Sequence, residues 1–175
     1  MSNVEHAVKQ LGPWQAGSPA VLYRNVLILG WYGKANVEAA QEFGTLAESA
    51  LMQSRQAMIS TVHWIDRAVG IPDSPTRDAL LKVGNDFRER TACVAAIIVG
   101  DGFWASAMRG VVTGLVVLAP RTFAMRTFAS AREVLEWLPA EHAERTGVDL
   151  DHDVLRAAIE RIGKRESGEP GQLQP

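Results

Sequence analysis

Residues 91–99 read Thr-Ala-Cys-Val-Ala-Ala-Ile-Ile-Val, and the run ends at Gly100-Asp101-Gly102. The run is almost entirely apolar and rich in β-branched side chains, which favours a strand covered on both faces of a sheet. The two glycines predict a turn into an apolar helix from about Phe103 to Leu118, ended by Pro120. A buried strand followed by such a helix is typical of an α/β protein.

The chain on both sides of this run also alternates strands with helices. Because strand-helix-strand units place their strands parallel, the predicted fold is α/β, with a small, mixed, partly parallel sheet of four to five strands and helices packed on it. Further strands are expected at residues 20–24, 26–32, 56–62 and 122–128. Further helices are expected to begin at the capping residues Asn36, Ser74 and Ser130.

Two terminal helices are expected beside the main domain, which is placed at residues 20–139. Residues 1–13 form the expected N-terminal helical segment, on the spacing of Val4, Val8 and Leu11. Residues 149–164 form the expected C-terminal amphipathic helix, and the glycines and proline within residues 165–175 predict a disordered tail. Residues 63–73 lack a clear period and are expected to be mostly loop.

Charge and cysteine content limit the function classes. A net charge of −2 with scattered basic residues gives no reason to expect nucleic-acid binding. The lone Cys93 lies in the apolar run and is expected to be a core residue in a reducing, cytoplasmic compartment. The N-terminal residues show no signal-peptide pattern. The apolar stretch Phe103–Ala119 is interrupted by Arg109 and is short for a bilayer, so no transmembrane segment is expected.

Residues 126–138 read Arg-Thr-Phe-Ala-Ser-Ala-Arg-Glu-Val-Leu-Glu-Trp-Leu. With the strand-helix order, this ending resembles the sulphate-transporter and anti-sigma-factor-antagonist (STAS) domains, in particular their SpoIIAA-like members, which share a fold with the lipid-carrying Sec14 proteins. The resemblance covers about Ala20 to Leu138. It implies a module that works through protein contacts, and it implies that Ser74, in the pair Asp73-Ser74, is phosphorylated by a partner kinase. From the residues alone, the favoured interpretation of Ser74 is a plain helix cap.

A second candidate site lies at the expected carboxyl ends of the parallel strands, where open α/β sheets bind ligands. Aromatic and charged residues gather there and could line a ligand or partner surface, or could pack under one another and close the core. They are Trp31, Tyr32, Lys34, His63, Trp64, Asp66, Asp101, Phe103 and Trp104.

His63 and Asp66 could form a general-base pair, since a carboxylate can orient an imidazole. No nucleophile pattern, nucleotide-binding loop or metal-ligand spacing accompanies them. We therefore expect no catalytic activity, no cofactor and no metal, and keep an enzyme using His63 with Asp66 only as a remote alternative.

Two helical stripes are candidate self-association surfaces. Ser106, Gly110 and Gly114 recur every four residues and would let a second backbone approach closely, either within the protein or in a homodimer. On the C-terminal helix the candidate contacts are Val154, Leu155, Ile159 and Ile162, which could instead dock on the protein's own domain. The leading expectation is a non-catalytic protein-interaction module in bacterial signalling or scaffolding. It would bind a protein partner or form a homodimer. The alternative is a carrier of a small apolar ligand or lipid, of the Sec14 type.

Overall fold

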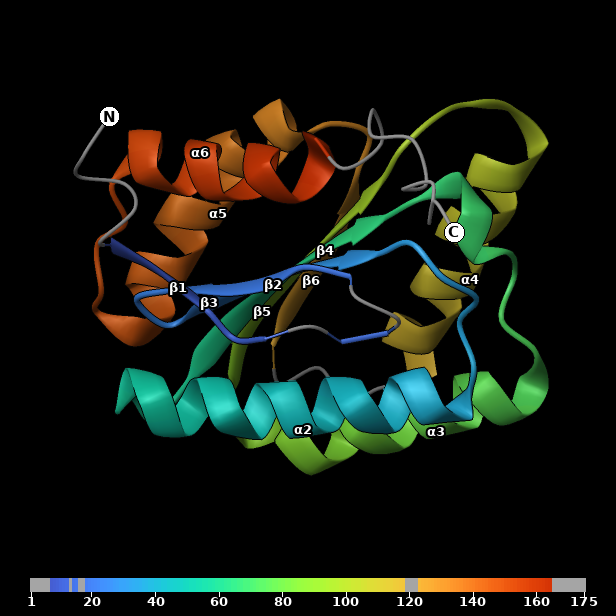
Figure 1. Ribbon diagram of the computed structural model, residues 1–175, viewed down its shortest axis with the longest axis horizontal. Coiled ribbons are helices and arrows are strands. Elements are labelled where there is room, and N and C mark those ends of the chain that lie inside the picture. Colours follow the sequence, from blue (N-terminus) through green and yellow to red (C-terminus); the bar gives the residue numbers. More distant parts are fainter. Residues whose placement is uncertain (1–6, 13, 16–17, 119–122, 165–175) are drawn as a thin grey trace, which may run out of the picture.

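A six-stranded mixed sheet forms the centre of the protein, with its strands side by side in the order of the sequence (Figure 1). The structure is a computed structural model, and it describes residues 7–12, 14–15, 18–118 and 123–164. Neighbouring strands are antiparallel from β1 to β3 and parallel from β3 to β6. The strands are β1 (Val8–Gln10), β2 (Ala20–Tyr23), β3 (Val26–Trp31), β4 (Ile59–Ile65), β5 (Thr91–Ile98) and β6 (Ala124–Phe128).

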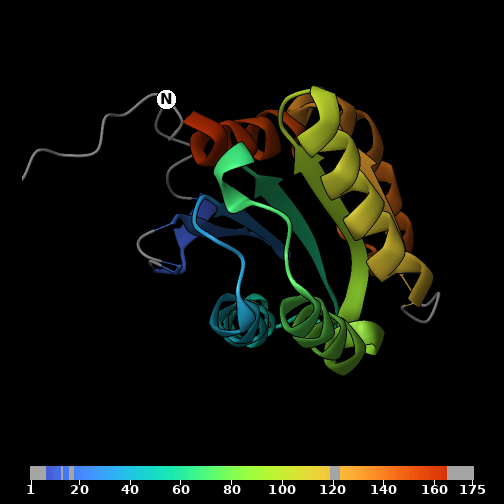
Figure 2. The same ribbon diagram turned by 90° about the vertical axis from the view of Figure 1, so that its right-hand side faces the viewer.

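The helices divide between the two faces of this sheet (Figure 2). The parallel strands are connected by α2 (Val37–Ser54), α3 (Ser74–Phe87) and α4 (Gly102–Leu118). Crossovers of one hand that step in one direction place their helices on the same face, and residues of α2 and α4 accordingly share one core cluster. The opposite face is covered by α5 (Ala131–Thr146) and α6 (His152–Gly163), which share the other core cluster. Among the described helices, none combines the length and apolar content that a bilayer-spanning helix requires.

The mixed α/β prediction is confirmed, but the sheet has six strands instead of four to five. The additional strand is β1, because Val8–Gln10 pairs with β2 instead of continuing the predicted N-terminal helix. Its apolar side chain at Val8 is buried in the same core cluster as Tyr23. Residues 1–6 and Pro13 of the predicted N-terminal helical segment lie outside the described residues. The predicted tail at residues 165–175 also lies outside them.

Helix capping follows the sequence at two of the three expected positions. Asn36 accepts a hydrogen bond from the Ala39 amide at 2.8 Å, and Ser130 caps α5. At the third position the cap is Asp73, whose carboxylate accepts from the Thr76 amide at 3.0 Å. Ser74 is therefore the first residue of α3 and not its cap, because the preceding carboxylate already satisfies the free amide.

Two expected element ends are wrong. The strand β4 continues past Val62 to Ile65, because His63 and Trp64 pair with β3 opposite Leu29 and Gly30. The helix α5 continues through Pro139 to Thr146. A proline removes one amide from the helical pattern, but the turns beyond it bury His142 on the sheet, so the packing maintains the helix. Residue 139 is therefore not an end of the folded unit.

The C-terminal helix α6 docks on the protein's own sheet. Its side chains Leu155, Ile159 and Ile162 are fully buried in the core cluster of that face. Gly163 allows this close approach, since a Cβ atom there would lie 2.5 Å from the Trp64 ring. The Tyr32 hydroxyl donates to the Ile162 carbonyl at the end of the helix. These three buried side chains are thus not accessible to a partner, and Val154 is only half-buried beside them.

We expect Ile159→Ala to lower the free energy of unfolding by about 3 kcal/mol, because it leaves a cavity in a fully packed layer. Glu160→Ala, an exposed neighbour on the same helix, should change it by less than about 0.5 kcal/mol. Urea unfolding of both variants measures this. Equal effects would show that α6 is not docked in solution.

Candidate ligand-binding cavity

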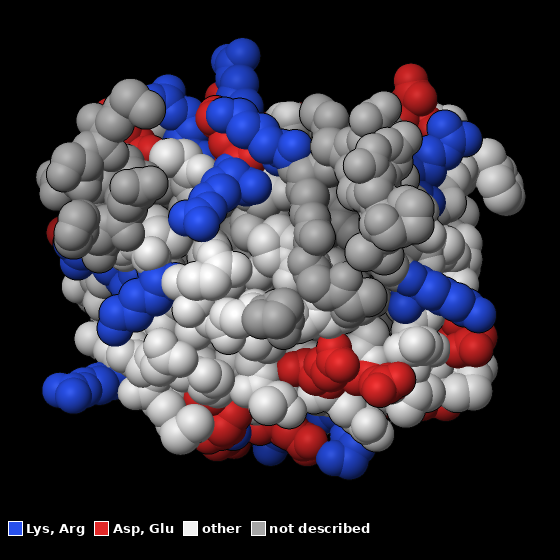
Figure 3. All heavy atoms as spheres, in the orientation of Figure 1, with Lys and Arg blue, Asp and Glu red and all other residues white. Residues whose placement is uncertain are grey.

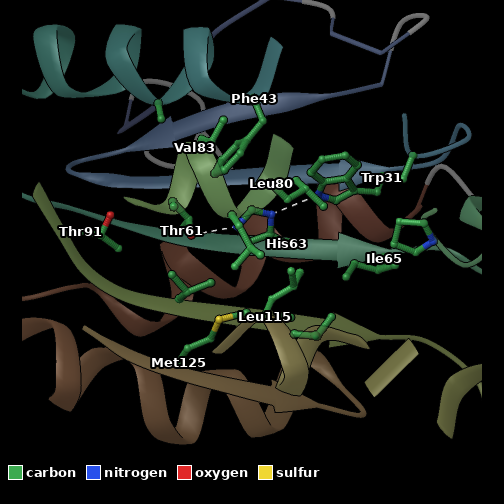
Figure 4. Close-up of a pocket in the computed structure, with 18 of the residues that line it drawn as sticks. Trp31, Phe43, Thr61, His63, Ile65, Leu80, Val83, Thr91, Leu115 and Met125 are labelled. Carbon is green, nitrogen blue, oxygen red and sulfur yellow. Dashed lines mark hydrogen bonds between the residues drawn. The ribbon is translucent and has the colours of Figure 1, made fainter. Parts of the chain in front are cut away.

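An apolar cavity of about 160 Å³ lies between the sheet and the helices α2, α3 and α4 (Figure 4). Alternate residues of neighbouring strands form its floor, among them Thr61, His63, Val94 and Met125. Val94 shows the effect on packing: it is the one half-buried residue of β5, although it lies in the middle of an interior strand. The centre of the sheet is therefore only partly covered on this face.

The cavity exists because α3 packs beside α2 more closely than against the sheet. The two helices are close at Gly44 of α2, where an added Cβ atom would be in ordinary van der Waals contact with a Val83 methyl group at 3.5 Å. The apolar side chains of α3 that face inward, such as Leu80 and Leu81, remain half-buried and line the cavity. Gly84, on the same lining, has no atom within 4 Å of its would-be Cβ. The missing side chain leaves space that the neighbouring helices do not fill.

His63 is held by two hydrogen bonds in the cavity, drawn as dashed lines in Figure 4. The Trp31 indole Nε1–H donates to His63 Nδ1 at 3.0 Å. An indole nitrogen can only donate, so Nδ1 must be the unprotonated ring nitrogen. The other ring nitrogen, Nε2, then carries the proton and donates to Thr61 Oγ1 at 2.9 Å. The tautomer of His63 is therefore fixed by the tryptophan.

The environment also keeps His63 neutral. Desolvation by burial lowers its pKa from 6.5 to about 4. Its ring stacks on Trp31 with centroids 6.2 Å apart and meets the Phe43 ring edge-on at 5.0 Å. Since the lone pair of Nδ1 already accepts the indole proton, His63 has no free basic nitrogen to offer a substrate.

His63 and Asp66 do not form the general-base pair that the sequence suggested. Both nitrogens of His63 are engaged by Trp31 and Thr61. The Asp66 carboxylate instead caps the short helix Arg67–Val69, accepting from the Ala68 amide at 2.7 Å. The strand directs the two residues to different surroundings, because β4 ends between them at Ile65.

The expected aromatic edge is split between the two faces of the sheet. Trp31 and His63 line the cavity, whereas Trp64 packs under α6. Tyr32 is hydrogen-bonded to the same helix. This division follows from strand alternation, since Trp64 is adjacent to His63 and points to the opposite face. The rest lie apart: Lys34, Asp101 and Phe103 are exposed, and Trp104 is half-buried against the core.

A second histidine lies in a buried polar network on the opposite face. Asn25 donates through Nδ2 to the Met58 carbonyl at 3.0 Å, which leaves its Oδ1 to accept from His142 Nε2 at 3.0 Å. His142 Nδ1 then accepts the Ser60 hydroxyl proton at 2.7 Å. The Cys93 thiol lies 3.0 Å from Ser60 Oγ and donates to it. The network joins the turn between β2 and β3, where Asn25 lies, to β4, β5 and α5.

This network resembles a nucleophile-histidine-amide array in composition, but its burial excludes substrates. All four side chains have 0% exposure. Burial raises the pKa of the Cys93 thiol to about 11 and lowers the pKa of His142 to about 4, so both groups are neutral near pH 7. The interpretation of Cys93 as a core residue is confirmed. The network fixes the packing of α5 on the sheet.

The remaining candidate residues are on the surface. Ser74 is exposed at the start of α3. Ser106, Gly110 and Gly114 lie on the exposed face of α4, so they do not pack on the protein's own sheet. Phe103 precedes them with 91% of its side chain exposed.

Sequence reasoning missed the cavity residues Thr61 and Gly84 as site residues, and missed the Asn25–Ser60–His142 network. The alternation of Thr61 and His63 along one strand face was a usable signal for the first. The sequence contained no usable signal for the network, since Asn25 and His142 are 117 positions apart.

In the described ranges, no group of three or more His, Cys, Asp or Glu side chains is arranged to hold a metal ion. Comparison of the chain with protein-family models, curated proteins and solved structures found no match.

We expect stability to fall as the pH is lowered from about 6.5 to 4. The half-buried His63 and the buried His142 both have lowered pKa values in the folded state, so in this window the unfolded chain binds up to two more protons. The free energy of unfolding should therefore fall by up to about 2.7 kcal/mol per pH unit near pH 5. Urea titrations at a series of pH values measure this slope. His142→Asn should reduce it by about half, and a flat profile above pH 5 would contradict the assignment of both histidines.

Proposed function

We propose that the protein binds a small apolar molecule in the cavity between its sheet and the helices α2, α3 and α4. The observation that carries the proposal is the cavity itself, about 160 Å³ in volume and lined almost wholly by apolar side chains. A dry cavity of about 150 Å³ with a similar lining accommodates benzene. A ligand of about that size fits this space.

The energetic cost of the cavity supports a binding role. Apolar side chains that line unfilled space lose packing contacts, which lowers the stability of a protein. The lining of this cavity is of that kind. A ligand that fills the cavity would restore the lost contacts.

The charge distribution gives no comparable support for a polyanionic ligand. On the face shown in Figure 3, some of the described Lys and Arg side chains gather near the top of the view with Asp or Glu among them, and the others are scattered over uncharged surface. The cavity lining includes no charged residue at all, since its polar members are two threonines, Trp31 and the neutral His63. Apolar contact is therefore the recognition that the lining offers.

We expect benzene, used as a probe, to raise the melting temperature of the wild-type protein and to shift the methyl resonances of Met108 and Met125, which line the cavity. At five times its Kd the gain in stability should be about 1 kcal/mol. Gly84→Leu should abolish both effects by filling the space. Asn85→Leu, an exposed neighbour on α3, is the matched control. Benzene effects that survive Gly84→Leu would place binding elsewhere.

A second candidate function is a protein-contact module that self-associates through α4. The specific observation is the exposed Phe103 at the start of a helix whose outer face carries Ser106, Gly110 and Gly114. A large exposed apolar side chain beside a strip of small residues suits contact with another helix. The partner in this proposal is a second copy of the chain, packed through the same face.

In that case light scattering should show a dimer, and Gly110→Leu should convert it to a monomer because the added side chain keeps the helices apart. Gln53→Leu, which adds an apolar side chain on the exposed face of α2, should leave the dimer intact. If light scattering still shows a wild-type monomer when the protein concentration is raised 100-fold, this function is ruled out.

We also propose that the fold is STAS-like. The sequential parallel strands with their helices on one face support this. So does the packing of the motif at residues 126–138, where the rings of Phe128 and Trp137 have centroids 5.3 Å apart and Arg126 lies over both. Phosphorylation of the exposed Ser74 remains part of this proposal, since a phosphate there would lie at the N-terminus of α3.

A further inference from the structure

The cavity contains a hydrogen-bond donor with no acceptor in the described protein. Trp31 donates to His63 Nδ1, which requires Nε2 to hold the ring proton. Nε2–H therefore donates to Thr61 Oγ1, and the hydroxyl of Thr61 acts as the acceptor in that bond. Its own proton is not used by this contact. Within the described residues, no other hydrogen bond of Thr61 Oγ1 is found.

The position of this hydroxyl matters because the rest of the lining has little to offer a polar ligand atom. Thr91, the other threonine of the lining, donates its hydroxyl to the Phe87 carbonyl at 3.0 Å. The Trp31 indole N–H is used by His63, and His63 Nε2–H by Thr61. Figure 4 shows Thr61 beside His63 on β4, with the apolar side chains of α2 and α3 opposite.

We infer that the cavity selects a small apolar ring carrying one hydrogen-bond acceptor, such as a ketone or ester oxygen, which accepts from the Thr61 hydroxyl. This inference rests on the proposed ligand-binding function and specifies its ligand class. A buried donor without an acceptor is costly, so a ligand oxygen at this position is favoured over a methylene group of the same size. Trp31 and His63 are positioning residues: they orient the hydroxyl by occupying its acceptor side.

The alternative tautomer would remove the donor. If Nδ1 carried the proton, Nε2 would accept the Thr61 hydroxyl proton, and that hydroxyl would have no proton left to donate to a ligand. The indole N–H prevents this state, because two N–H groups would then face each other across 3.0 Å. Trp31 thus sets the selectivity without contacting the ligand oxygen, because it acts through His63 and Thr61.

Cyclohexanone and methylenecyclohexane test the inference, because they differ only in a carbonyl oxygen replaced by a methylene group. The Kd of each is measured by methyl chemical-shift titration for the wild-type protein, Thr61→Val and Thr61→Ser. Thr61→Val should raise the Kd of cyclohexanone by about 3- to 10-fold, the range of one net hydrogen bond. It should change that of methylenecyclohexane by less than about twofold. In Thr61→Val, a methyl group takes the position of Oγ1. It also prevents the His63 Nε2–H from reaching the ligand oxygen and replacing the lost donor. Thr61→Ser, which keeps the hydroxyl, should retain the wild-type preference.

Equal changes in both Kd values, or none in that of cyclohexanone, would overturn the inference and leave the proposed cavity function intact. Failure of both probes to bind the wild-type protein would overturn the two together. If Thr61→Val does not fold, the wild-type protein still decides. The carbonyl stretch of bound cyclohexanone should lie below its frequency in an alkane, and an unshifted band would overturn the inference. The ¹⁵N shifts of His63 should show an unprotonated Nδ1, and a protonated Nδ1 would overturn it as well.

Discussion

The handedness of strand-helix-strand connections constrains most of this structure. The parallel strands β3 to β6 lie in sequence order, so each crossover steps in the same direction and all three connecting helices must cover the same face. The opposite face would remain bare without α5 and α6, which follow the last strand and complete the second core cluster. The C-terminal helix is thus required by the sheet, and is not an addition to a finished domain. Its docking through Gly163 and Trp64 is a consequence of that requirement.

Three helices on one face also explain where the unfilled space lies. Close packing of α3 on α2 at Gly44 separates α3 from the sheet, and small side chains leave the gap open. Ala96 on the floor and Gly84 on the opposite wall are such positions. Larger side chains at these places would give a more stable protein without a cavity. The polar residues Thr61 and His63, placed in this otherwise apolar lining, are difficult to explain by stability alone and fit recognition of a ligand.

The sequence was a good guide to elements and a poor guide to the site. The apolar run at residues 91–99 correctly predicted an interior strand, and Asn36 and Ser130 correctly marked helix starts. The prediction of a strand at residues 56–62 was right about Thr61 and failed from His63 onward, where a loop was expected. A histidine on an interior face of β4 breaks the apolar pattern by which a strand is recognised. The helix predicted at Val8–Gln10 was wrong for another reason. A short segment can satisfy helical spacing and still pair with a neighbouring strand.

Ser60 and Thr61 are consecutive on β4, yet each is hydrogen-bonded to a histidine on a different face of the sheet. The register of this strand is defined by the contacts that leave it, from Ser60 to His142 and from His63 to Trp31. A slip by one residue would exchange the faces of all its side chains, moving His63 away from Trp31 and placing a different side chain opposite His142. An all-apolar strand between two apolar layers would tolerate such a slip far better, since either face would accept its side chains. The contacts of Ser60 with His142 and of His63 with Trp31 therefore act against misfolding, because they make one alignment of β4 distinguishable from its neighbours during assembly of the sheet.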